Sequence, residues 1–288
     1  MVQQIDRVFF IQPAASLTIS LALILYWRRT RGFSGYVLML SFAAYFLAIV
    51  LKEVVQDLTY NSVVGAFGYV SVGTGLYFGV QTSLFEVGLA YVFARYGARS
   101  KRVTSKDAVV LGLGLSFWEN GLLLGALSLL SLAVTYALLA SGGSLASTIA
   151  SQLPSGYFEP AATALSAVAL GTLERISSMM AHIAWGVLCV LSVATGKKRY
   201  LGIALPMGMI DATVPFAGQV GAVVFEVVIF MISVCCLGAA WVSKSTEASH
   251  QQSTPQETQS GQALAFRTRP ATSLAFKMVR QTIVNKGM

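Results

Sequence analysis

The fold is decided by residues 170–194, which read LGTLERISSMMAHIAWGVLCVLSVA. The stretch is apolar and long enough to cross a bilayer, since about 20 apolar residues span the hydrocarbon core. It nevertheless carries three ionisable residues, Glu174, Arg175 and His182. Ionisable residues inside a membrane span are costly and usually face a protein interior or a water-filled cavity. This segment therefore predicts a membrane protein with a polar site inside it.

The composition of the whole chain agrees with this interpretation. Of the 288 residues, 55% are hydrophobic and only 11% are charged, whereas soluble domains carry about a quarter charged residues. The net charge of +8 does not indicate a nucleic-acid partner, because the basic residues cluster at the ends of apolar runs. All three cysteines lie in apolar runs, so the sequence contains neither a disulfide framework nor a CxxC metal pattern.

The apolar runs predict an all-α polytopic membrane protein with about seven transmembrane helices. They lie near 9–27, 36–51, 74–95, 108–139, 165–195, 201–217 and 220–243. At about 1.5 Å per residue, the fourth and fifth runs exceed a hydrocarbon core of about 30 Å, so they should tilt or project. The stretch 54–73 is interrupted by glycines, and we expect it to lie at the membrane interface. The first run is interpreted as a retained span rather than a cleaved signal.

The distribution of basic residues predicts the orientation in the cell membrane. Basic clusters follow the first, third and fifth spans and recur after the last one: 28–31, 95–106, 197–199 and 244–288. The alternate connections hold only Lys52, and 140–164 has no Lys or Arg. We therefore expect the N-terminus outside and the C-terminus in the cytoplasm.

The chain is expected to divide into a membrane domain, 1–244, and a cytoplasmic tail, 245–288. Residues 245–262 are rich in Ser, Thr and Gln and are interpreted as a disordered linker. Residues 263–288 carry five basic and no acidic residues among apolar ones, which suits an amphipathic segment on anionic lipid. A frayed, solvated end is the alternative for this last segment.

Four ionisable residues share one calculated depth, although they come from four different spans. Glu86, Glu119, His182 and Asp211 lie nine to thirteen residues from the cytoplasmic ends of their spans. At about 1.5 Å per residue, each lies roughly 14–20 Å from the inner face, near the bilayer midplane. Charges at that depth cost several kcal/mol unless they share partners. We therefore expect one site that contains all four; four residues that each pair locally are the alternative.

Other polar residues in the spans are expected to have supporting roles. Asn120 adjoins Glu119 and is expected to hydrogen-bond it or to orient a substrate carbonyl. The same depth calculation places three further residues at the outer edge of the membrane: Glu174, Arg175 and Glu226. We interpret them as an interfacial ion-pair set.

Glycine and proline positions predict two local features of the spans. Gly112 and Gly114 precede Glu119 and let another helix approach closely. Pro206 and Pro215 flank Asp211, so that span should be kinked, and the backbone groups freed there can line a cavity.

The pattern alone assigns no metal site. Zinc prefers several His or Cys ligands, whereas this set offers one histidine with carboxylates. If a divalent metal such as zinc binds, its candidate ligands are His182, Glu86 and Glu119.

These residues also resemble a known family. The matching stretches are FEVGLAY with Glu86, GLGLSFWEN with Glu119, and LERISSMMAHI with His182, followed by Asp211 in a later span. They resemble the YhfC family of intramembrane proteases, which is related to the CAAX-processing (CPBP) glutamic proteases. The resemblance covers most of residues 75–215, and LERISSMMAHI is its most specific part.

The resemblance implies an intramembrane peptidase and a role for each residue of the site. Glu86 would be the general base that activates water, and His182 would support the oxyanion. Glu119 and Asp211 would shape the proton network. The implied substrate is a membrane-bound peptide or protein.

The chain departs from the family motifs at three positions. The first motif reads Glu-Glu-x-x-Arg, but Val87 and Ala90 replace its second Glu and its Arg. The fourth motif resembles His-x-x-x-Asp, but Met207 replaces the His. These departures leave open a catalytically degenerate relative that binds a membrane peptide or partner. A proton-coupled transporter is a further alternative, because midplane carboxylates and a histidine also form proton relays.

Overall fold

The computed structural model describes residues 5–32, 34–158 and 161–253. The chain divides into two units, Met1–Lys244 and Ser245–Met288. Throughout the described residues the regular elements are helices, and they contain no strand. In order they are η1 (Arg7–Phe10), α1 (Ile11–Thr30), α2 (Gly35–Phe67), α3 (Val72–Gln81), η2 (Thr82–Val87), α4 (Gly88–Arg99), η3 (Ser105–Asp107), α5 (Ala108–Ser116), η4 (Phe117–Leu127), α6 (Ser128–Ser141), α7 (Gly143–Gln152), η5 (Ser155–Phe158), α8 (Ala161–Thr195), α9 (Arg199–Met207), η6 (Gly208–Phe216), α10 (Ala217–Val220) and α11 (Ala222–Ser253).

Seven helical segments of the described part are long and apolar enough to cross a membrane. They are Arg7–Thr30, Gly35–Phe67, Val72–Arg99, Ser105–Ser141, Ala164–Thr195, Arg199–Val220 and Ala222–Ser249. The prediction of an all-helical protein with seven spans is therefore confirmed. The orientation of the termini stays a prediction.

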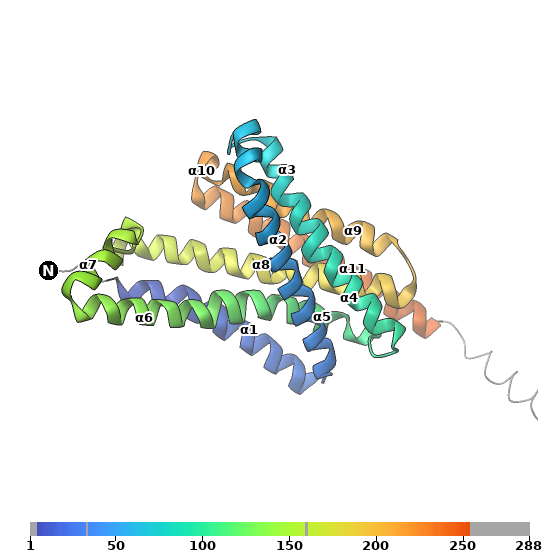
Figure 1. Ribbon diagram of the computed structural model, residues 1–288. Helices are drawn as coiled ribbons and strands as arrows, with labels where there is room; N and C mark the ends of the chain where they lie inside the picture. The colour runs from blue at the N-terminus through green and yellow to red at the C-terminus, as the bar shows by residue number, and fades with distance from the viewer. Residues whose placement is uncertain (1–4, 33, 159–160, 254–288) are drawn as a thin grey trace, which may run out of the picture. The chain divides into compact units, whose positions relative to one another are not determined.

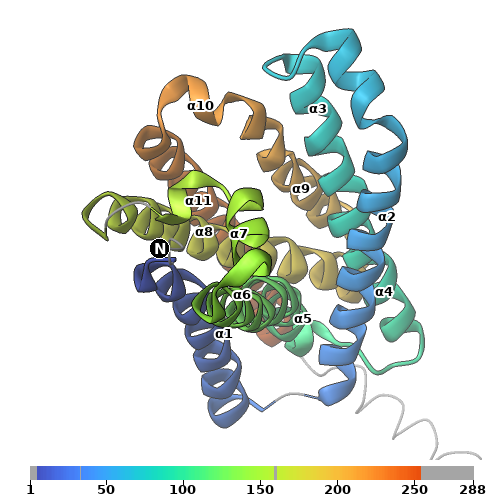
Figure 2. The ribbon, with the colours of Figure 1, turned by 60° about the vertical axis from the view of Figure 1, so that its left-hand side comes forward.

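Helix α8 is the central element of the first unit. It packs against α1, α4, α5 and α9 (Figures 1 and 2). A Cβ atom on Gly112 of α5 would lie 2.6 Å from the carbonyl oxygen of Ile183 in α8, and Gly186 of α8 meets the backbone of Gly112. The close helix approach expected at Gly112 is therefore present, and it sets the distance between α5 and α8.

The expectation for 54–73 was wrong, because most of this stretch continues the second span. Helix α2 runs without a break to Phe67, and the chain turns at Gly68, whose φ of 78° favours glycine. Ser71 then caps α3 by accepting a hydrogen bond from the backbone N–H of Thr74. No proline occurs between Lys52 and Gly68, so the charged residues there do not end the helix. Lys52 therefore lies inside a span and not in a connection.

Three segments, η2, η4 and η6, interrupt the regular α-helices of the spans. Segments η2 and η4 are π-helical, and each continues directly into α-helix on both sides. Segment η6 is a 3₁₀-helix with Pro206 just before it and Pro215 within it, which gives the expected irregular span. A Cβ atom on Gly208 would lie 2.7 Å from the Cα of Ser83. This glycine lets η6 lie directly against η2.

The tail begins differently from the expected linker. Helix α11 continues to Ser253, because residues 245–253 contain no glycine or proline and Pro255 is the first breaker after them. Residues 254–288, which include the expected lipid-binding segment 263–288, lie outside the described residues.

Candidate active site

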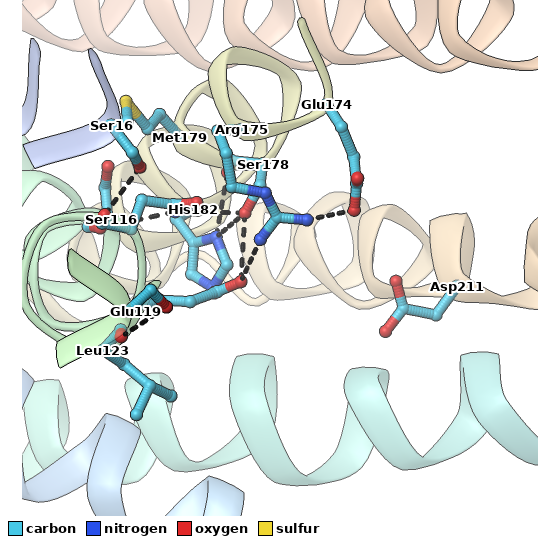
Figure 3. A network of polar contacts seen from close by, with 12 residues as sticks. Ser16, Ser116, Glu119, Leu123, Glu174, Arg175, Ser178, Met179, His182 and Asp211 are labelled. Carbon is cyan, nitrogen blue, oxygen red and sulfur yellow. Dashed lines mark hydrogen bonds and ion pairs between the residues drawn. The ribbon is translucent and has the colours of Figure 1, made fainter. Parts of the chain in front are cut away.

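Three ionisable side chains converge at the centre of the first unit. Glu86 of η2, Glu119 of η4 and His182 of α8 each offer a ligand atom, and these atoms lie within 4.8 Å of one another. His182 Nε2 lies 2.7 Å from Glu119 Oε2 and 3.2 Å from Glu86 Oε2. Glu86 and His182 are buried. Figure 3 shows Glu119 reaching from η4 to the ring of His182.

The second nitrogen of His182 determines what its first nitrogen can do. Nδ1 lies 2.9 Å from the carbonyl oxygen of Ser178, one helical turn earlier. A carbonyl oxygen only accepts, so Nδ1 carries the hydrogen of this bond. Nε2 then faces two carboxylate oxygens, and this arrangement requires a proton or a metal cation at Nε2. Fixing one imidazole nitrogen through a backbone carbonyl is the usual support of a metal-binding histidine.

Two basic residues hold the outer oxygens of the two glutamates. Lys52 Nζ lies 2.5 Å from Glu86 Oε1 and Arg175 Nη1 lies 3.7 Å from Glu119 Oε1. Each carboxylate therefore points one oxygen at a basic residue and the other at His182. This division keeps both Oε2 atoms directed at the same point.

Asp211 of η6 lies beside this cluster but outside it (Figure 3). Its Oδ2 accepts a hydrogen bond from the hydroxyl of Thr82 and lies 3.5 Å from Lys52 Nζ. Its side chain is 36% exposed, compared with 8% for Glu86 and 4% for His182. Asp211 is thus more accessible than the two glutamates that contact His182.

A cavity of about 200 Å³ contains all four residues that the depth calculation brought together: Glu86, Glu119, His182 and Asp211. Lys52, Thr82, Arg175 and Ser178 also line it, together with apolar residues such as Trp185, Phe225 and Ile229. The catalytic roles implied for the four residues stay predictions.

We expected Glu174, Arg175 and Glu226 to form an ion-pair set at the outer edge of the membrane, apart from the site. Arg175 pairs with Glu174, as expected, but it also faces Glu119, and both Arg175 and Glu174 line the cavity. Residues 175, 178 and 182 share one face of α8. Arg175 reaches Glu119 because its side chain is long, and the depth calculation considered only the position of each residue along the helix. Glu226 lies within electrostatic reach of Glu174 and Arg175, and its Oε2 is buried without a hydrogen-bond partner in the described part of the chain.

Asn120 does not reach the substrate side of the site. It is completely buried and donates hydrogen bonds to Ser178 Oγ at 3.1 Å and to Ser116 O at 3.4 Å. Ser178 Oγ in turn donates to Glu119 Oε1 at 3.3 Å. Glu119 lines the cavity and Asn120 does not. It supports the site through Ser178.

The sequence analysis missed Lys52, Thr82 and Ser178. Lys52 was counted as part of a connection, because charged residues follow it. The missing signal was the absence of any helix breaker before Gly65 and Gly68, which places Lys52 in the middle of a long helix.

A family model describing the YhfC intramembrane metalloproteases matches residues 15–233. The chain belongs to this family. No curated protein and no solved structure matches the sequence. Membership of the YhfC family and the seven apolar helices make this chain a multi-pass membrane protein.

The YhfC family name implies a metal, and the residues present fit one. Two carboxylate oxygens and one imidazole nitrogen converge, and catalytic zinc sites typically use three such protein ligands and leave a further position open. The charges that line the cavity are also consistent with a metal ion. Four carboxylates line the cavity, those of Glu86, Glu119, Glu174 and Asp211, against the two basic side chains of Lys52 and Arg175. With a neutral His182 the formal charge is −2, which a divalent cation would neutralise.

Proposed function

We propose that this protein is an intramembrane metallopeptidase that hydrolyses a peptide bond of a membrane-embedded substrate. Glu86, Glu119 and His182 would hold the metal. The observation that carries the proposal is the convergence of Glu86 Oε2, Glu119 Oε2 and His182 Nε2. Such a metal would activate a water molecule and polarise the scissile carbonyl.

The remaining residues of the site have separable tasks in this proposal. Lys52 and Arg175 hold the two glutamates in position through their outer oxygens. Asp211 is the proton acceptor, since both of its bonds within the described residues use Oδ2 and leave Oδ1 free. Glu86 acts as a ligand and not as the general base implied by the family resemblance, because both of its oxygens already face partners.

The substrate would reach the cavity from the lipid side, past α11. Phe225 and Ile229 of α11 form part of the cavity wall. Yet α11 is the least buried of the seven spans, with 6% of its apolar window buried, compared with 72% for α8. A wall helix with so little packing separates from its neighbours at low cost.

The decisive experiment combines metal analysis with peptide cleavage. The purified protein in detergent should contain about one divalent metal per chain, as three converging ligands require. Glu86→Gln, Glu119→Gln and His182→Ala should each lose the metal and the cleavage of membrane-spanning peptides. A protein that never holds a metal and still cleaves would refute the metal assignment.

A second candidate is a relative that binds a membrane peptide without cutting it. Lys52, 2.5 Å from Glu86, is the observation in its favour, because this ammonium group compensates carboxylate charge without a metal. Val87 and Ala90, which replace the motif's Glu and Arg, are fully buried in the apolar core, so this chain takes its basic partner from α2 instead. Peptide binding without cleavage, unaffected by Glu86→Gln, would favour this candidate.

A further inference from the structure

A second cavity adjoins the candidate active site and shares one residue with it. This cavity, of about 380 Å³, lies between the start of α1, the first half of α6 and Tyr157. Arg175 is the residue that lines both cavities. The two cavities therefore meet at the Arg175 side chain, whose guanidinium group faces Glu119.

Helix α6 contributes three residues with hydroxyl groups to the wall of this cavity. Ser128, Ser131 and Thr135 line it, and their spacing of three and four residues places them on one helical face. Ser131 is exposed, as are its neighbours Leu130 and Val134 at 61% and 50%, but of these three only Ser131 lines the cavity. Ser128 and Thr135 donate hydrogen bonds to the backbone carbonyl oxygens of Leu123 and Ser131. Their oxygen atoms can still accept hydrogen bonds from water in the cavity.

The α1 side of the cavity adds a further polar group. Gln12 lines the cavity, and its side chain lies directly against Gly171 of α8, where a Cβ atom would come within 2.7 Å of Nε2. Gly171 lies one helical turn before Arg175. The polar lining thus continues from the α6 hydroxyl groups to the residue shared by the two cavities.

The contacts of Arg175 allow its guanidinium group to change partners. Its Nη1 lies 3.7 Å from Glu119, Nη2 pairs with Glu174, and Nε is buried without a hydrogen-bond partner in the described residues. Glu226 offers a third carboxylate within electrostatic reach, and its Oε2 is also buried and unpartnered. The guanidinium therefore has an alternative acceptor on α11 when it leaves Glu119.

We propose that the second cavity is a water-filled chamber that supplies the hydrolytic site, with Arg175 as the gate between them. The inference rests on the proposed function, because hydrolysis consumes water that an apolar bundle does not deliver by itself. The chamber has room for on the order of ten water molecules. A movement of Arg175 from Glu119 towards Glu226 would join the two cavities.

The first test asks whether the chamber contains water. In a background with Cys189, Cys235 and Cys236 changed to Ala, single cysteines replace Ser131 and Thr135, with Leu130→Cys and Val134→Cys as matched controls on the lipid side. A charged, membrane-impermeant thiol reagent reacts with the thiolate, which forms in water. Ser131→Cys and Thr135→Cys should react at least about tenfold faster than the controls. Equal rates for all four would overturn the proposal.

The second test concerns the gate. Ser178→Cys reports reagent that has reached the active-site side of Arg175. Arg175→Ala should accelerate its labelling at least about fivefold. Arg175→Lys, which keeps the charge but not the planar guanidinium fork, should give a rate between that of the wild type and that of Arg175→Ala. Ser131→Trp, which fills the chamber, should abolish the acceleration. If neither Arg175→Ala nor Ser131→Trp changes the labelling rate of Ser178→Cys, the chamber does not lead to the site.

These labelling rates can be interpreted even if the protein proves to have no peptidase activity. Thiol labelling needs neither metal nor cleavage, so an inactive protein with a wet chamber and a responsive gate would separate the two proposals. Thermal unfolding of each variant identifies those that have lost their fold and excludes them.

Discussion

Lys52 is the residue on which the charge arrangement depends most. It lies 2.5 Å from Glu86 and 3.5 Å from Asp211, and removing one member of a buried ion pair leaves its partners uncompensated. We predict that Lys52→Met lowers the free energy of unfolding by about 3 kcal/mol, whereas Lys52→Arg retains most of the stability. The measurement is denaturation of the detergent-solubilised protein.

The exposed Lys106 provides the control for this substitution. Lys106→Met should change the stability by less than about 0.5 kcal/mol, as surface substitutions usually do. Wild-type stability in Lys52→Met would mean that Glu86 and Asp211 do not need a cation between them.

Asp211 and the metal ligands should respond differently to substitution. Asp211→Asn keeps the shape of the side chain and removes the proton acceptor, so we predict a loss of turnover of about a hundredfold or more with the metal content unchanged. Metal analysis and cleavage rates on the same preparation separate the two effects. Loss of the metal in Asp211→Asn would place this residue among the ligands.

The residue scale also shows what the sequence could and could not reveal. Helix rise converts sequence number into depth, so the shared depth of Glu86, Glu119, His182 and Asp211 was calculable in advance. Depth says nothing about rotation around a helix or side-chain reach. Arg175 was therefore assigned to the edge, and Asn120 was expected to hydrogen-bond Glu119 or to orient a substrate carbonyl. The position of Arg175 follows from the reach of its side chain, and that of Asn120 from rotation around the helix.

Among the elements, the contact between α5 and α8 positions Glu119 relative to His182. A Cβ atom at Gly112 would lie 2.6 Å from Ile183 O, a backbone atom that cannot rotate away. We predict that Gly112→Ala lowers the unfolding free energy by about 1–3 kcal/mol and weakens metal binding. Gly202 is the matched control, because nothing lies within 4 Å of the corresponding Cβ. Gly202→Ala should be neutral or stabilising, since alanine favours helix.

Helix α11 allows a test of substrate access. Ile229 faces the cavity, whereas its neighbour Val228 is 49% exposed on the other side. We predict that Ile229→Trp reduces cleavage at least about tenfold by filling the access route, while metal binding persists. Val228→Trp faces lipid and should leave cleavage within about twofold of wild type. Equal effects of the two variants would argue against access past α11.

At the scale of the whole molecule, the hydropathy pattern predicted seven spans because helix length and bilayer thickness constrain each other. It failed at 54–73, where charged residues and glycines mimicked a loop. The polar residues there include Gln56 and Thr59, which hydrogen-bond Gln81 and Tyr77 of α3, so low hydropathy does not mark the end of the helix. That same error concealed Lys52, so one misplaced boundary removed one residue from the site.

The orientation is testable on intact cells. The basic residues predict that Ser100 faces the cytoplasm and Ser147 the exterior, and both are exposed. In the cysteine-free background, an impermeant thiol reagent should label Ser147→Cys at once and Ser100→Cys only after permeabilisation. The opposite pattern would invert the topology.

The π-helical segments η2 and η4 carry both glutamates of the cluster. A π-segment holds a surplus residue relative to the α-helix around it, so the direction of Glu86 and Glu119 depends on the number of residues before and after them. A one-residue deletion in either segment would let it relax into ordinary α-helix, with the flanking turns kept in register and the glutamate of that segment turned away from its present direction. The span would still be apolar, and the carboxylate would still be in the sequence. The catalytic arrangement is thus vulnerable to insertions and deletions that a comparison of substitutions alone would never reveal.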